Sequence, residues 1–233
     1  MDTYEWEDPF GPFTISLPEG VFRPTYTTKE LAQVLRVDAS ETVLDMGCGC
    51  GILGLIAARA GAKFVIGCDA SKRAVETAQE NAATLGLAER MCFFVSDLFE
   101  ALPKATRADV VIGDVSGIPD ALASVTGWYP GGRTGAELPV QMLEQVREHL
   151  LPSGRLYLPT GTIQNDTDIL LAAGRVFRKL TVLATKELPL PAGITETEGV
   201  AELIREGIIR LRQKGSRFLW TLNVYGCTEP IGA

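Results

Sequence analysis

The fold of this chain is decided by the stretch Val43-Leu44-Asp45-Met46-Gly47-Cys48-Gly49-Cys50-Gly51-Ile52-Leu53-Gly54. Its first residues are mainly apolar and β-branched, which predicts a short buried parallel strand. The run 52–60 predicts a helix, and the three glycines between them predict a tight turn that brings bare backbone N–H groups to a ligand. Because the helix start adds the positive end of its dipole, we expect an anionic group to bind there.

The composition narrows the function classes. With 233 residues, 46% of them hydrophobic, the chain can bury the core of one domain. A net charge of −7 argues against a nucleic-acid partner, because phosphate binding needs clustered Lys and Arg. No apolar run approaches the roughly 20 residues of a bilayer span, and the amino terminus lacks the basic start of a signal peptide, so we expect a cytoplasmic protein with no membrane partner.

The cysteines and the single histidine bear on metal and redox chemistry. The five cysteines form no Cys-x-x-Cys pair, and they lie in apolar segments or in the glycine turn. They are Cys48, Cys50, Cys68, Cys92 and Cys227. We therefore expect reduced, packed thiols and no metal site.

Strands and helices alternate after residue 41. We expect strands at 42–44, 64–68, 92–95, 109–112, 155–158, 180–184 and 217–225, and helices at 52–60, 72–85, 138–150 and 168–177. A glycine-rich loop, 114–137, interrupts the alternation. The pattern predicts right-handed βαβ units, and hence an α/β fold with a largely parallel sheet covered by helices on both faces.

Two segments stand outside this alternation. Residues 1–36 are expected to form an extended arm and a helix that cover the active site, with Thr27 or Thr28 as the helix cap and Glu30 closing its first turn. Residues 37–233 form the main domain. Within it, 189–215 reads as a helical insertion, which either covers the substrate or packs at the sheet edge.

Four expected strands end in or near an aspartate: Asp45, Asp69, Asp97 and Asp114. Ligands of open α/β sheets bind outside the carboxyl ends of the strands, so four acids at that edge predict a polar crevice. Asp69 follows Gly49 by 20 positions, the interval at which a second-strand acid reaches a ribose diol. The ligand is therefore predicted to be a nucleoside.

A dinucleotide is the rival ligand, because residues 49–54 also satisfy the pattern G-x-G-x-x-G. Asp45 and Asp97 would place negative charge near a pyrophosphate, and no His or Lys lies in an evident hydride-transfer position. An NAD-dependent oxidoreductase remains an alternative hypothesis.

Three sets of residues carry a resemblance to a known family: 43–51, 67–71 with 74–81, and 96–99. Together they resemble the class I S-adenosylmethionine-dependent methyltransferases. Within that superfamily, 18–24 and the Gly-Gly-Arg-Thr-Gly run are similar to the glutamine-N5 methyltransferases of peptide-release factors. The Asn-Pro-Pro-Tyr motif of that branch is replaced here by Asp114-Val115-Ser116-Gly117, which puts methylation of a planar amide in doubt.

The resemblance implies a Rossmann-like seven-stranded sheet with its last strand antiparallel, and S-adenosyl-L-methionine as cofactor. In it, the turn glycines would face the methionyl part, Asp45 would hold the turn or the ammonium group, Asp69 the ribose, and Asp97 with the Leu98 backbone the adenine. Asp114 would stand beside the sulfonium. The implied cofactor-binding residues are Asp45, Gly47, Cys48, Gly49, Gly51, Asp69, Ala70, Asp97, Leu98 and Asp114.

The catalytic and acceptor residues are sought on the segments that surround the same crevice. Candidate catalytic residues are Asp114, Ser116 and Tyr26, and candidate acceptor contacts are Tyr26, Trp128, Tyr129 and Arg133. His149 is expected to be structural, because it ends a helix at the opposite edge of the sheet.

The predicted activity is methyl transfer from S-adenosylmethionine to a small-molecule acceptor by in-line displacement. The acidic surface and the missing amide motif favour that acceptor class. A protein side chain is the alternative acceptor, and a non-catalytic nucleoside-binding module is a further alternative.

Overall fold

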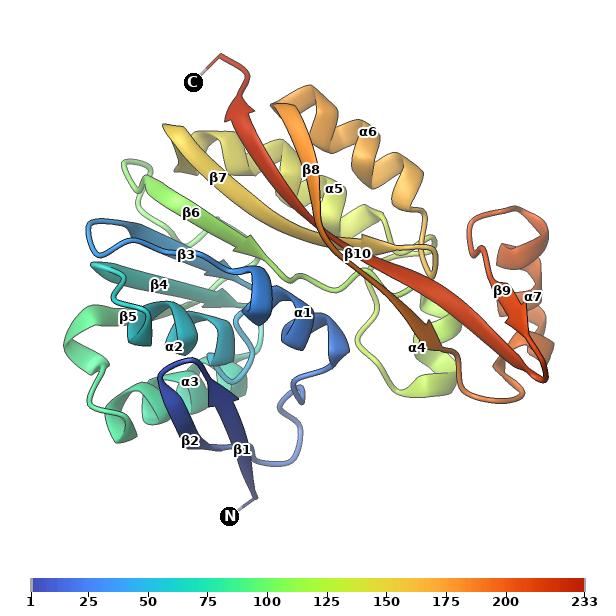
Figure 1. The fold of residues 1–233 in the computed structure, drawn as a ribbon, viewed down its shortest axis with the longest axis horizontal. Coiled ribbons are helices and arrows are strands. Elements are labelled where there is room, and N and C mark those ends of the chain that lie inside the picture. Colours follow the sequence, from blue (N-terminus) through green and yellow to red (C-terminus); the bar gives the residue numbers. More distant parts are fainter. Residues whose placement is uncertain (1, 233) are drawn as a thin grey trace.

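The computed structural model describes residues 2–232, and it shows a large twisted sheet with helices on both faces (Figure 1). The strands of the large sheet are β3 (Thr42–Met46), β4 (Phe64–Asp69), β5 (Met91–Val95), β6 (Ala108–Gly113), β7 (Leu150–Gly161), β8 (Phe177–Pro189), β9 (Arg212–Lys214) and β10 (Arg217–Pro230). The α-helices are α1 (Tyr26–Val34), α2 (Ile52–Arg59), α3 (Lys72–Thr84), α4 (Asp120–Thr126), α5 (Glu137–Val146), α6 (Asp166–Val176) and α7 (Glu198–Arg205). A separate hairpin pairs β1 (Thr3–Asp8) with β2 (Gly11–Ser16).

The strand order confirms the predicted sheet. The order is β5-β4-β3-β6-β7-β10-β8, with short β9 paired to β10. Strands β3 to β7 pair in parallel, whereas β10 is antiparallel to both β7 and β8. Numbered from β3, the order is 3-2-1-4-5-7-6, which differs from the order 3-2-1-4-5-6 of dinucleotide-binding folds. The topology therefore speaks against the dinucleotide alternative.

Successive residues of β3 enter two different cores, which is why neighbouring positions of the strand are both apolar. Val43 packs in the cluster that α1 and α2 cover, whereas Leu44 packs in the cluster that α5 and α6 cover. Both side chains are completely buried. Because side chains alternate across a strand, a strand covered on both faces is apolar at most positions, and in β3 the buried exception is Asp45.

Residues 3–16 form a hairpin where the sequence led us to expect an extended arm. Trp6 pairs with Phe13 across the hairpin, and both are buried against α2. Arg59 of α2 holds the hairpin by donating to both carboxylate oxygens of Asp8, at 2.8 and 3.2 Å. Trp6, Phe13 and Ile15 point inward, and burial alternates along β2. This period of two residues is the sequence signal for a strand, and the expectation of an extended arm overlooked it.

Helix α1 begins earlier than predicted, and Thr25 is its cap. Thr25 accepts the N–H of Thr27 at 3.2 Å, while Thr28 Oγ1 accepts the N–H of Thr25 at 3.1 Å. The reciprocal pair satisfies the exposed donors of the first turn without an acidic residue. Glu30 instead accepts from Lys186 Nζ of β8 at 2.7 Å, so the predicted roles of Thr27 and Glu30 are wrong.

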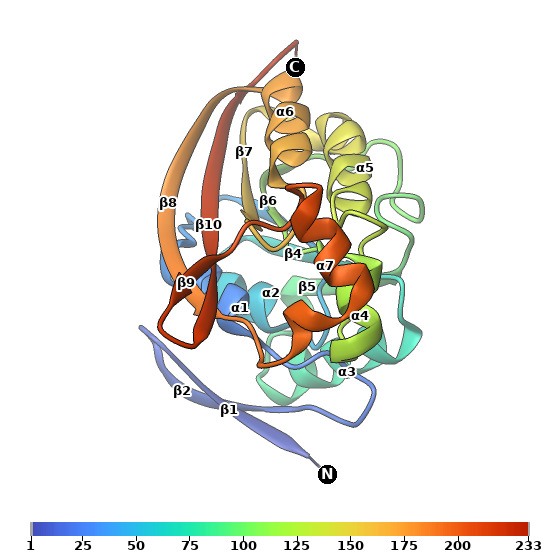
Figure 2. The same ribbon diagram turned by 90° about the vertical axis from the view of Figure 1, so that its right-hand side faces the viewer.

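Helices α4 and α7 lie side by side at one end of the sheet, beyond the ends of β8 and β10 (Figure 2). They enclose a third apolar cluster that includes Leu122, Val200 and Leu203. Helix α4 was missed because it lies inside the glycine-rich loop, and α7 covers only part of the helical insertion predicted at 189–215. We call residues 189–215 with α4 the distal lobe.

The long strands β8 and β10 reach out to the distal lobe and extend well past their predicted ends. Strand β8 is an edge strand whose side chains are mostly exposed, including Arg178, Lys179 and Lys186. Charged, exposed side chains protect a sheet edge from pairing with another strand. They also remove the alternation of apolar and polar residues by which a strand is predicted from sequence. In residues 2–232 no helix is both long enough and apolar enough to cross a bilayer.

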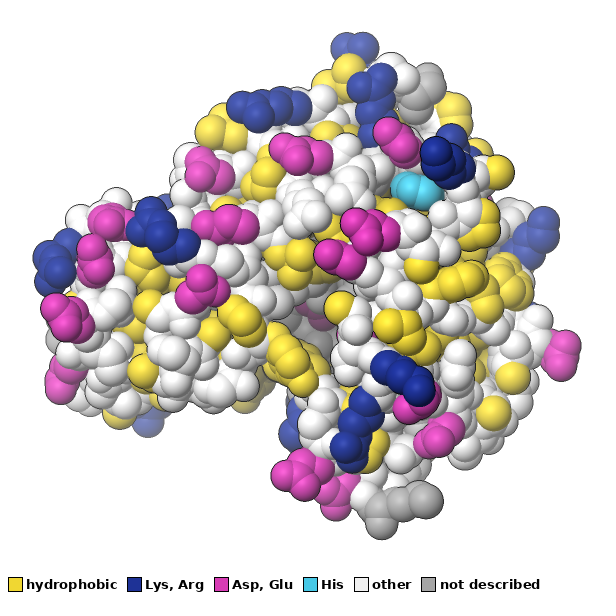
Figure 3. Space-filling model, turned by 180° about the vertical axis from the view of Figure 1, so that it is seen from behind, with side chains coloured by type: hydrophobic (Ala, Val, Ile, Leu, Met, Phe, Trp, Pro, Cys, Tyr) yellow, Lys and Arg dark blue, Asp and Glu magenta, His cyan; other side chains and the backbone are white. Residues whose placement is uncertain are grey.

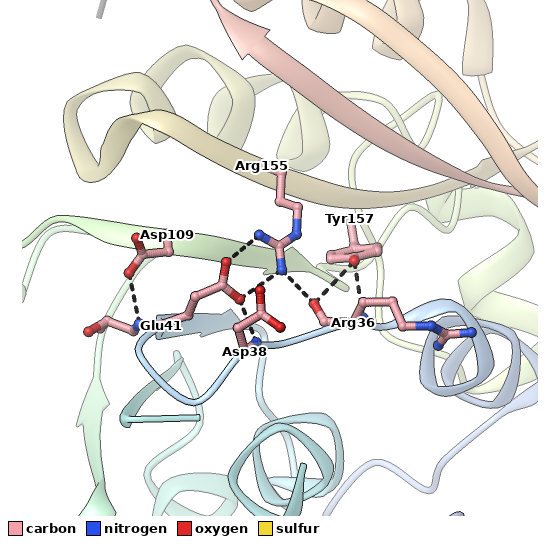
Figure 4. A network of polar contacts seen from close by, with 7 residues as sticks. Arg36, Asp38, Glu41, Asp109, Arg155 and Tyr157 are labelled. Carbon is pink, nitrogen blue, oxygen red and sulfur yellow. Dashed lines mark hydrogen bonds and ion pairs between the residues drawn. The ribbon is translucent and has the colours of Figure 1, made fainter. Parts of the chain in front are cut away.

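A network of charged groups fastens the chain between α1 and β3 to β7, near the start of β3 (Figure 4). Arg155 of β7 donates to both carboxylate oxygens of Glu41, at 2.6 and 2.8 Å, and to the carbonyl of Arg36 at 2.6 Å. The Arg155 guanidinium holds the pKa of Glu41 below its usual range. The charges of Glu41 and Arg155 are thus matched within the protein.

Candidate functional site

A cavity of about 550 Å³ opens at the carboxyl ends of the parallel strands. It is bounded by residues that follow β3, β4, β5, β6 and β7, by the segment before α1, and by the start of the distal lobe. The space-filling view shows a deep hollow with hydrophobic side chains at its border (Figure 3). This is the edge at which open α/β sheets bind ligands.

Glycine is required at the start of the turn after β3. Gly47 has a φ of +75°, and a Cβ there would lie 2.8 Å from the carbonyl oxygen of Asp114. The turn therefore packs directly on the loop after β6, with no room for a side chain between them. Gly49, with a φ of +53°, has nothing within 4 Å of a Cβ position and lines the cavity.

The N–H groups of the three turn glycines are not free, which corrects the sequence prediction. Those of Gly47 and Gly51 donate to the carbonyls of Cys68 and Cys48, at 2.9 and 2.8 Å. The N–H of Gly49 donates to Asp69 Oδ2 at 2.9 Å. Gly51 also lies outside the cavity lining, because it packs against α3.

The donors available to an anion lie one step further along the turn. Within residues 2–232 the N–H groups of Cys50 and Leu53 donate to no backbone carbonyl, that of Cys50 contacts only its own sulfur, and both residues line the cavity. Both stand at the start of α2, where the helix dipole favours negative charge. The anion site predicted from the glycines is thus moved to the backbone of these two residues.

Asp45 is buried behind the turn and does not line the cavity. Its Oδ2 accepts the N–H of Gly54 at 2.8 Å, and so it ties β3 to the first turn of α2. Its Oδ1 is the one fully buried side-chain polar atom in residues 2–232 that has no hydrogen-bond partner. Burial raises the pKa of Asp45 to about 7, and the charges of Asp114 and Asp69 add to that rise.

Asp69 ends β4 and faces the cavity with spare capacity. Its Oδ2 accepts from Gly49, and its Oδ1 accepts the N–H of Ser71 at 2.8 Å. A carboxylate has about four lone-pair sites, so two of them remain for a ligand. The backbone bonds hold the carboxylate in one orientation, as recognition of a diol requires.

The turn after β5 carries a strained residue. Leu98 has a φ of +45°, which is costly for a residue with a branched side chain, and Ser96 Oγ secures it by donating to the Leu98 carbonyl at 2.7 Å. The Leu98 N–H donates to no acceptor in residues 2–232, and both Leu98 and Asp97 line the cavity. The Leu98 N–H can donate a hydrogen bond to the edge of a planar ring, and the Asp97 carboxylate can accept one from it.

Asp114 follows β6 and lines the cavity. The residue as a whole is half-buried, but protein atoms crowd its carboxyl group, and this burial raises its pKa to about 7. A hydrogen bond with the Thr28 side chain opposes the rise. Asp114 can therefore change its charge near neutral pH, which suits a proton acceptor.

Ser116 lines the cavity, but its hydroxyl group is already in use. It donates to the carbonyl of Tyr129 at 2.5 Å, and so closes the loop between residues 116 and 129. Gly131 packs on the carbonyl of Ser116 so closely that a Cβ would overlap it. These contacts assign Ser116 to holding the loop, and Asp114 is left as the better-placed proton acceptor.

Aromatic side chains surround the mouth of the cavity. Phe22, Tyr26 and Tyr129 are 42, 57 and 50% exposed, and Trp128 lies half-buried deeper in the loop. Tyr129 donates through its hydroxyl group to the Gly20 carbonyl at 3.1 Å, and its ring meets that of Phe22 edge-on. The segment before α1 and the loop after β6 therefore meet across the mouth.

Two predicted features lie outside the cavity. Arg133 is exposed and pairs with Glu206 of the distal lobe at 3.2 Å, and it is not among the lining residues. His149 is buried and stacked on Phe99 at 4.8 Å, where burial lowers its pKa. His149 therefore has the structural role that was predicted.

The predicted site residues fall into two groups, and Asp45, Gly51 and Arg133 form the group that lies outside the cavity lining. Those that line the cavity are Tyr26, Gly47, Cys48, Gly49, Asp69, Ala70, Asp97, Leu98, Asp114, Ser116, Trp128 and Tyr129. Cys48, Cys50 and Cys68 are buried free thiols, and burial raises the pKa of Cys50 to about 11. They are packed and protonated, as expected.

Several residues that line the cavity were not predicted from the sequence as site residues. They include Thr28 of α1, Gln164 after β7, and Trp220 and Leu222 of β10. The position of Gln164, shortly after the carboxyl end of a parallel strand, was an available signal. No sequence signal marked the two residues of β10 as cavity residues. They reach this edge of the sheet only because β10 pairs with β7 in the antiparallel direction.

Comparison with known proteins assigns the fold. The family model for ribosomal protein L11 methyltransferase (PrmA) matches residues 26–119. The ribosomal protein L11 methyltransferase of Caldanaerobacter subterraneus subsp. tengcongensis is 33% identical over 141 residues, 60% of this chain and 38% of that protein. The chain spans about a quarter to two-fifths of the length of the curated relatives that it matches first.

Two solved structures show the same fold. The ribosomal protein L11 methylase of Lactobacillus delbrueckii subsp. bulgaricus superposes with a TM-score of 0.52 at 18% identity, over 87% of this chain and 77% of that one. A 16S rRNA N2 methyltransferase of T. thermophilus, in complex with AdoMet and guanosine, gives 0.64 at 18%, over 98% and 50%. The chain has the class I S-adenosylmethionine-dependent methyltransferase fold. The matching family model describes L11 methyltransferases, which corrects the closer likeness to release-factor enzymes.

Proposed function

We propose that this chain is an S-adenosylmethionine-dependent methyltransferase and that its methyl acceptor is a protein side chain. The observation that carries the cofactor assignment is a cavity in which carboxylates lack cations while backbone N–H groups lack acceptors. S-adenosylmethionine carries two positive groups and one carboxylate, and it supplies a methyl group on a positively charged sulfur.

Each polar part of the cofactor has a matching group in the cavity. The free N–H groups of Cys50 and Leu53 suit the carboxylate, and the spare lone pairs of Asp69 suit the ribose diol. The Leu98 N–H suits a ring nitrogen of adenine. The raised pKa values of Asp45 and Asp114 record carboxyl groups without a nearby cation, and a bound cation would lower both.

The names of the relatives and the shape of the mouth support a protein as acceptor. The matching family model and relatives are described as ribosomal protein L11 methyltransferases. The exposed rings of Phe22, Tyr26 and Tyr129 give a polypeptide an apolar rim to lie against while one side chain enters the cavity. The small-molecule acceptor favoured by composition alone thus becomes the second candidate.

An amine is the acceptor group that Asp114 suits best. An ammonium group has no lone pair for attack, so a proton must first leave the nitrogen. The Asp114 carboxylate, which lines the cavity, can accept that proton and hold it on a carboxyl oxygen. The amine then has its lone pair free, and Asp114 becomes neutral.

The test measures binding and transfer separately. Calorimetry with S-adenosylhomocysteine should detect binding by the wild-type protein, and labelled S-adenosylmethionine should label purified ribosomal protein L11. Asp114→Asn should reduce the transfer rate by about 100-fold and leave S-adenosylhomocysteine binding within a few-fold. Asp120→Asn, an exposed acid outside the cavity lining, is the matched control. No binding would overturn the cofactor assignment, and binding without labelling of L11 would overturn the acceptor.

A small-molecule acceptor is the second candidate because the inner wall of the cavity is apolar. Ile163, Trp220 and Leu222 line it, and a volume of about 550 Å³ lies within the range of small-molecule sites. A low-mass labelled product from a cell extract freed of macromolecules would favour this candidate over the protein acceptor.

A further inference from the structure

The side chain of Gln164 is buried at the wall of the cavity and mostly unpaired. The residue is 6% exposed and stands in the turn between β7 and α6. Its Nε2 donates to Thr160 Oγ1 at 3.0 Å, and Thr160 is 3% exposed. Both residues line the cavity.

Most of the hydrogen-bonding capacity of Gln164 is open to the cavity. A carboxamide has two donors and two acceptor sites, and within residues 2–232 the Gln164 side chain makes one hydrogen bond. Its Oε1 accepts no hydrogen bond within residues 2–232. In the same residues, Asp45 Oδ1 is the one side-chain polar atom that is both fully buried and without a hydrogen-bond partner, so Gln164 Oε1 is not fully buried. The Gln164 oxygen must therefore be reachable from the cavity.

Two glycines make room for this side chain. A Cβ on Gly117 would overlap Gln164 Oε1 and lie 2.7 Å from Nε2, and a Cβ on Gly135 would lie 3.0 Å from the Gln164 Cβ. Gly117 does not have a positive φ, so it is needed for space and not for backbone freedom. Gly117 belongs to the loop that begins with Asp114, and so the amide lies against the segment that also carries the proposed proton acceptor.

We propose that Gln164, oriented by Thr160, binds a carboxamide or peptide group of the methyl acceptor. The free Oε1 and the second N–H of Nε2 present one acceptor and one donor in a single plane, and another amide group complements both. A carboxylate would meet an oxygen instead of a donor at Oε1, with the Asp114 charge on the adjoining loop. The inference rests on the proposed function, because it names the part of the acceptor that this site recognises.

The test uses propionamide as the probe and side-chain amide signals as the readout. The protein, labelled with 15N, is titrated with propionamide in the presence and in the absence of S-adenosylhomocysteine. The Gln164 signals, identified by their loss in Gln164→Met, should shift and saturate, and propionate should leave them unchanged. Gln164→Met and Thr160→Val should each weaken propionamide binding by about tenfold.

Two controls keep the result decisive. Gln213→Met makes the same substitution at an exposed position of β9 and should leave propionamide binding unchanged. Gln164→Glu keeps the shape of the side chain, so it serves if Gln164→Met fails to fold, and it should also lose the probe. The inference would be overturned if propionamide left the Gln164 signals unshifted, or if all variants bound propionamide with equal affinity. If S-adenosylhomocysteine did not bind, the proposed function would be wrong. The propionamide titration in the absence of S-adenosylhomocysteine would still decide whether Gln164 binds an amide.

Discussion

Glu41 and Asp45 stand four residues apart, near opposite ends of β3, in opposite electrostatic surroundings. Glu41 has a bidentate arginine partner, which holds its pKa below its usual range. Asp45 has one backbone donor and one empty oxygen, and burial raises its pKa to about 7. One end of β3 is internally neutralised, whereas the other end meets a cavity that lacks cations.

The difference separates what stabilises the fold from what prepares it for a ligand. A buried charge is costly unless it is paired, and at the Glu41 end the protein supplies the partner itself. At the Asp45 end three carboxylates converge with no arginine or lysine among the lining residues. The proposed cofactor, with its ammonium and sulfonium groups, would provide the missing positive charge.

The largest expected effect comes from breaking the paired end. Arg155→Met should lower the free energy of unfolding by about 2–3 kcal/mol, because Glu41 and the Arg36 carbonyl lose their charged donor in a setting that is mostly shielded from water. Urea denaturation measures this loss, and S-adenosylhomocysteine affinity should stay unchanged. Arg212→Met breaks an equally short bidentate pair with Glu187 on the exposed surface, and its unfolding curve should match that of the wild type. Equal losses in both variants would contradict the role given to burial.

The next effect concerns the unpaired end. Asp69→Asn should weaken S-adenosylhomocysteine binding by about 10- to 100-fold, because a neutral amide forms weaker hydrogen bonds to the ribose than a carboxylate. Calorimetry measures the affinity, and an unchanged melting temperature shows an intact fold. Asp38→Asn, near the start of β3, is the control and should bind normally. Wild-type affinity in Asp69→Asn would remove the ribose assignment.

A smaller effect is the dependence of stability on pH in the absence of ligand. Asp45 and Asp114 have pKa values of about 7 in the folded protein against 3.8 in the reference state, so between these values the folded chain holds protons that the unfolded chain has released. The free energy of unfolding should therefore fall as pH rises from about 4 to 7. Glu41 acts in the opposite sense, because its stabilisation is lost as pH falls below 4.5.

Denaturation curves at several pH values measure both windows. Asp45→Asn should reduce the fall in stability between about pH 4 and 7, which Asp114 then causes alone, and it should leave the change below pH 4.5 unaltered. S-adenosylmethionine should flatten the upper window as well, since its positive groups lower both pKa values. An upper window that survives Asp45→Asn and Asp114→Asn together would show that other groups produce it.

The smallest effect tests the contact across the mouth. Tyr129→Phe removes the hydrogen bond to Gly20 but keeps the ring against Phe22, so stability should change by less than about 0.5 kcal/mol. Release of S-adenosylhomocysteine, followed by stopped flow, should accelerate by about two- to threefold. Tyr4→Phe in the hairpin is the control, and a faster release there would argue against a specific role for the mouth.

The sequence alone predicted the parallel half of the sheet and the acids at its edge. Local patterns suffice for this, because buried strands such as β3 are short apolar runs and Asp69 and Asp114 follow directly after such runs. It missed α4 and the true lengths of β8 and β10. Those elements are exposed or lie in a glycine-rich segment, so no local periodicity marks them.

Tertiary structure decided which of the predicted groups remain free to act. The glycine N–H groups and the Ser116 hydroxyl are consumed by partners that are distant in sequence, and Arg133 is paired with the distal lobe. Gln164 became notable only when Gly117 was brought against it. Sequence determines which chemical groups follow each strand, but hydrogen bonding and burial depend on neighbours that only the folded chain assembles.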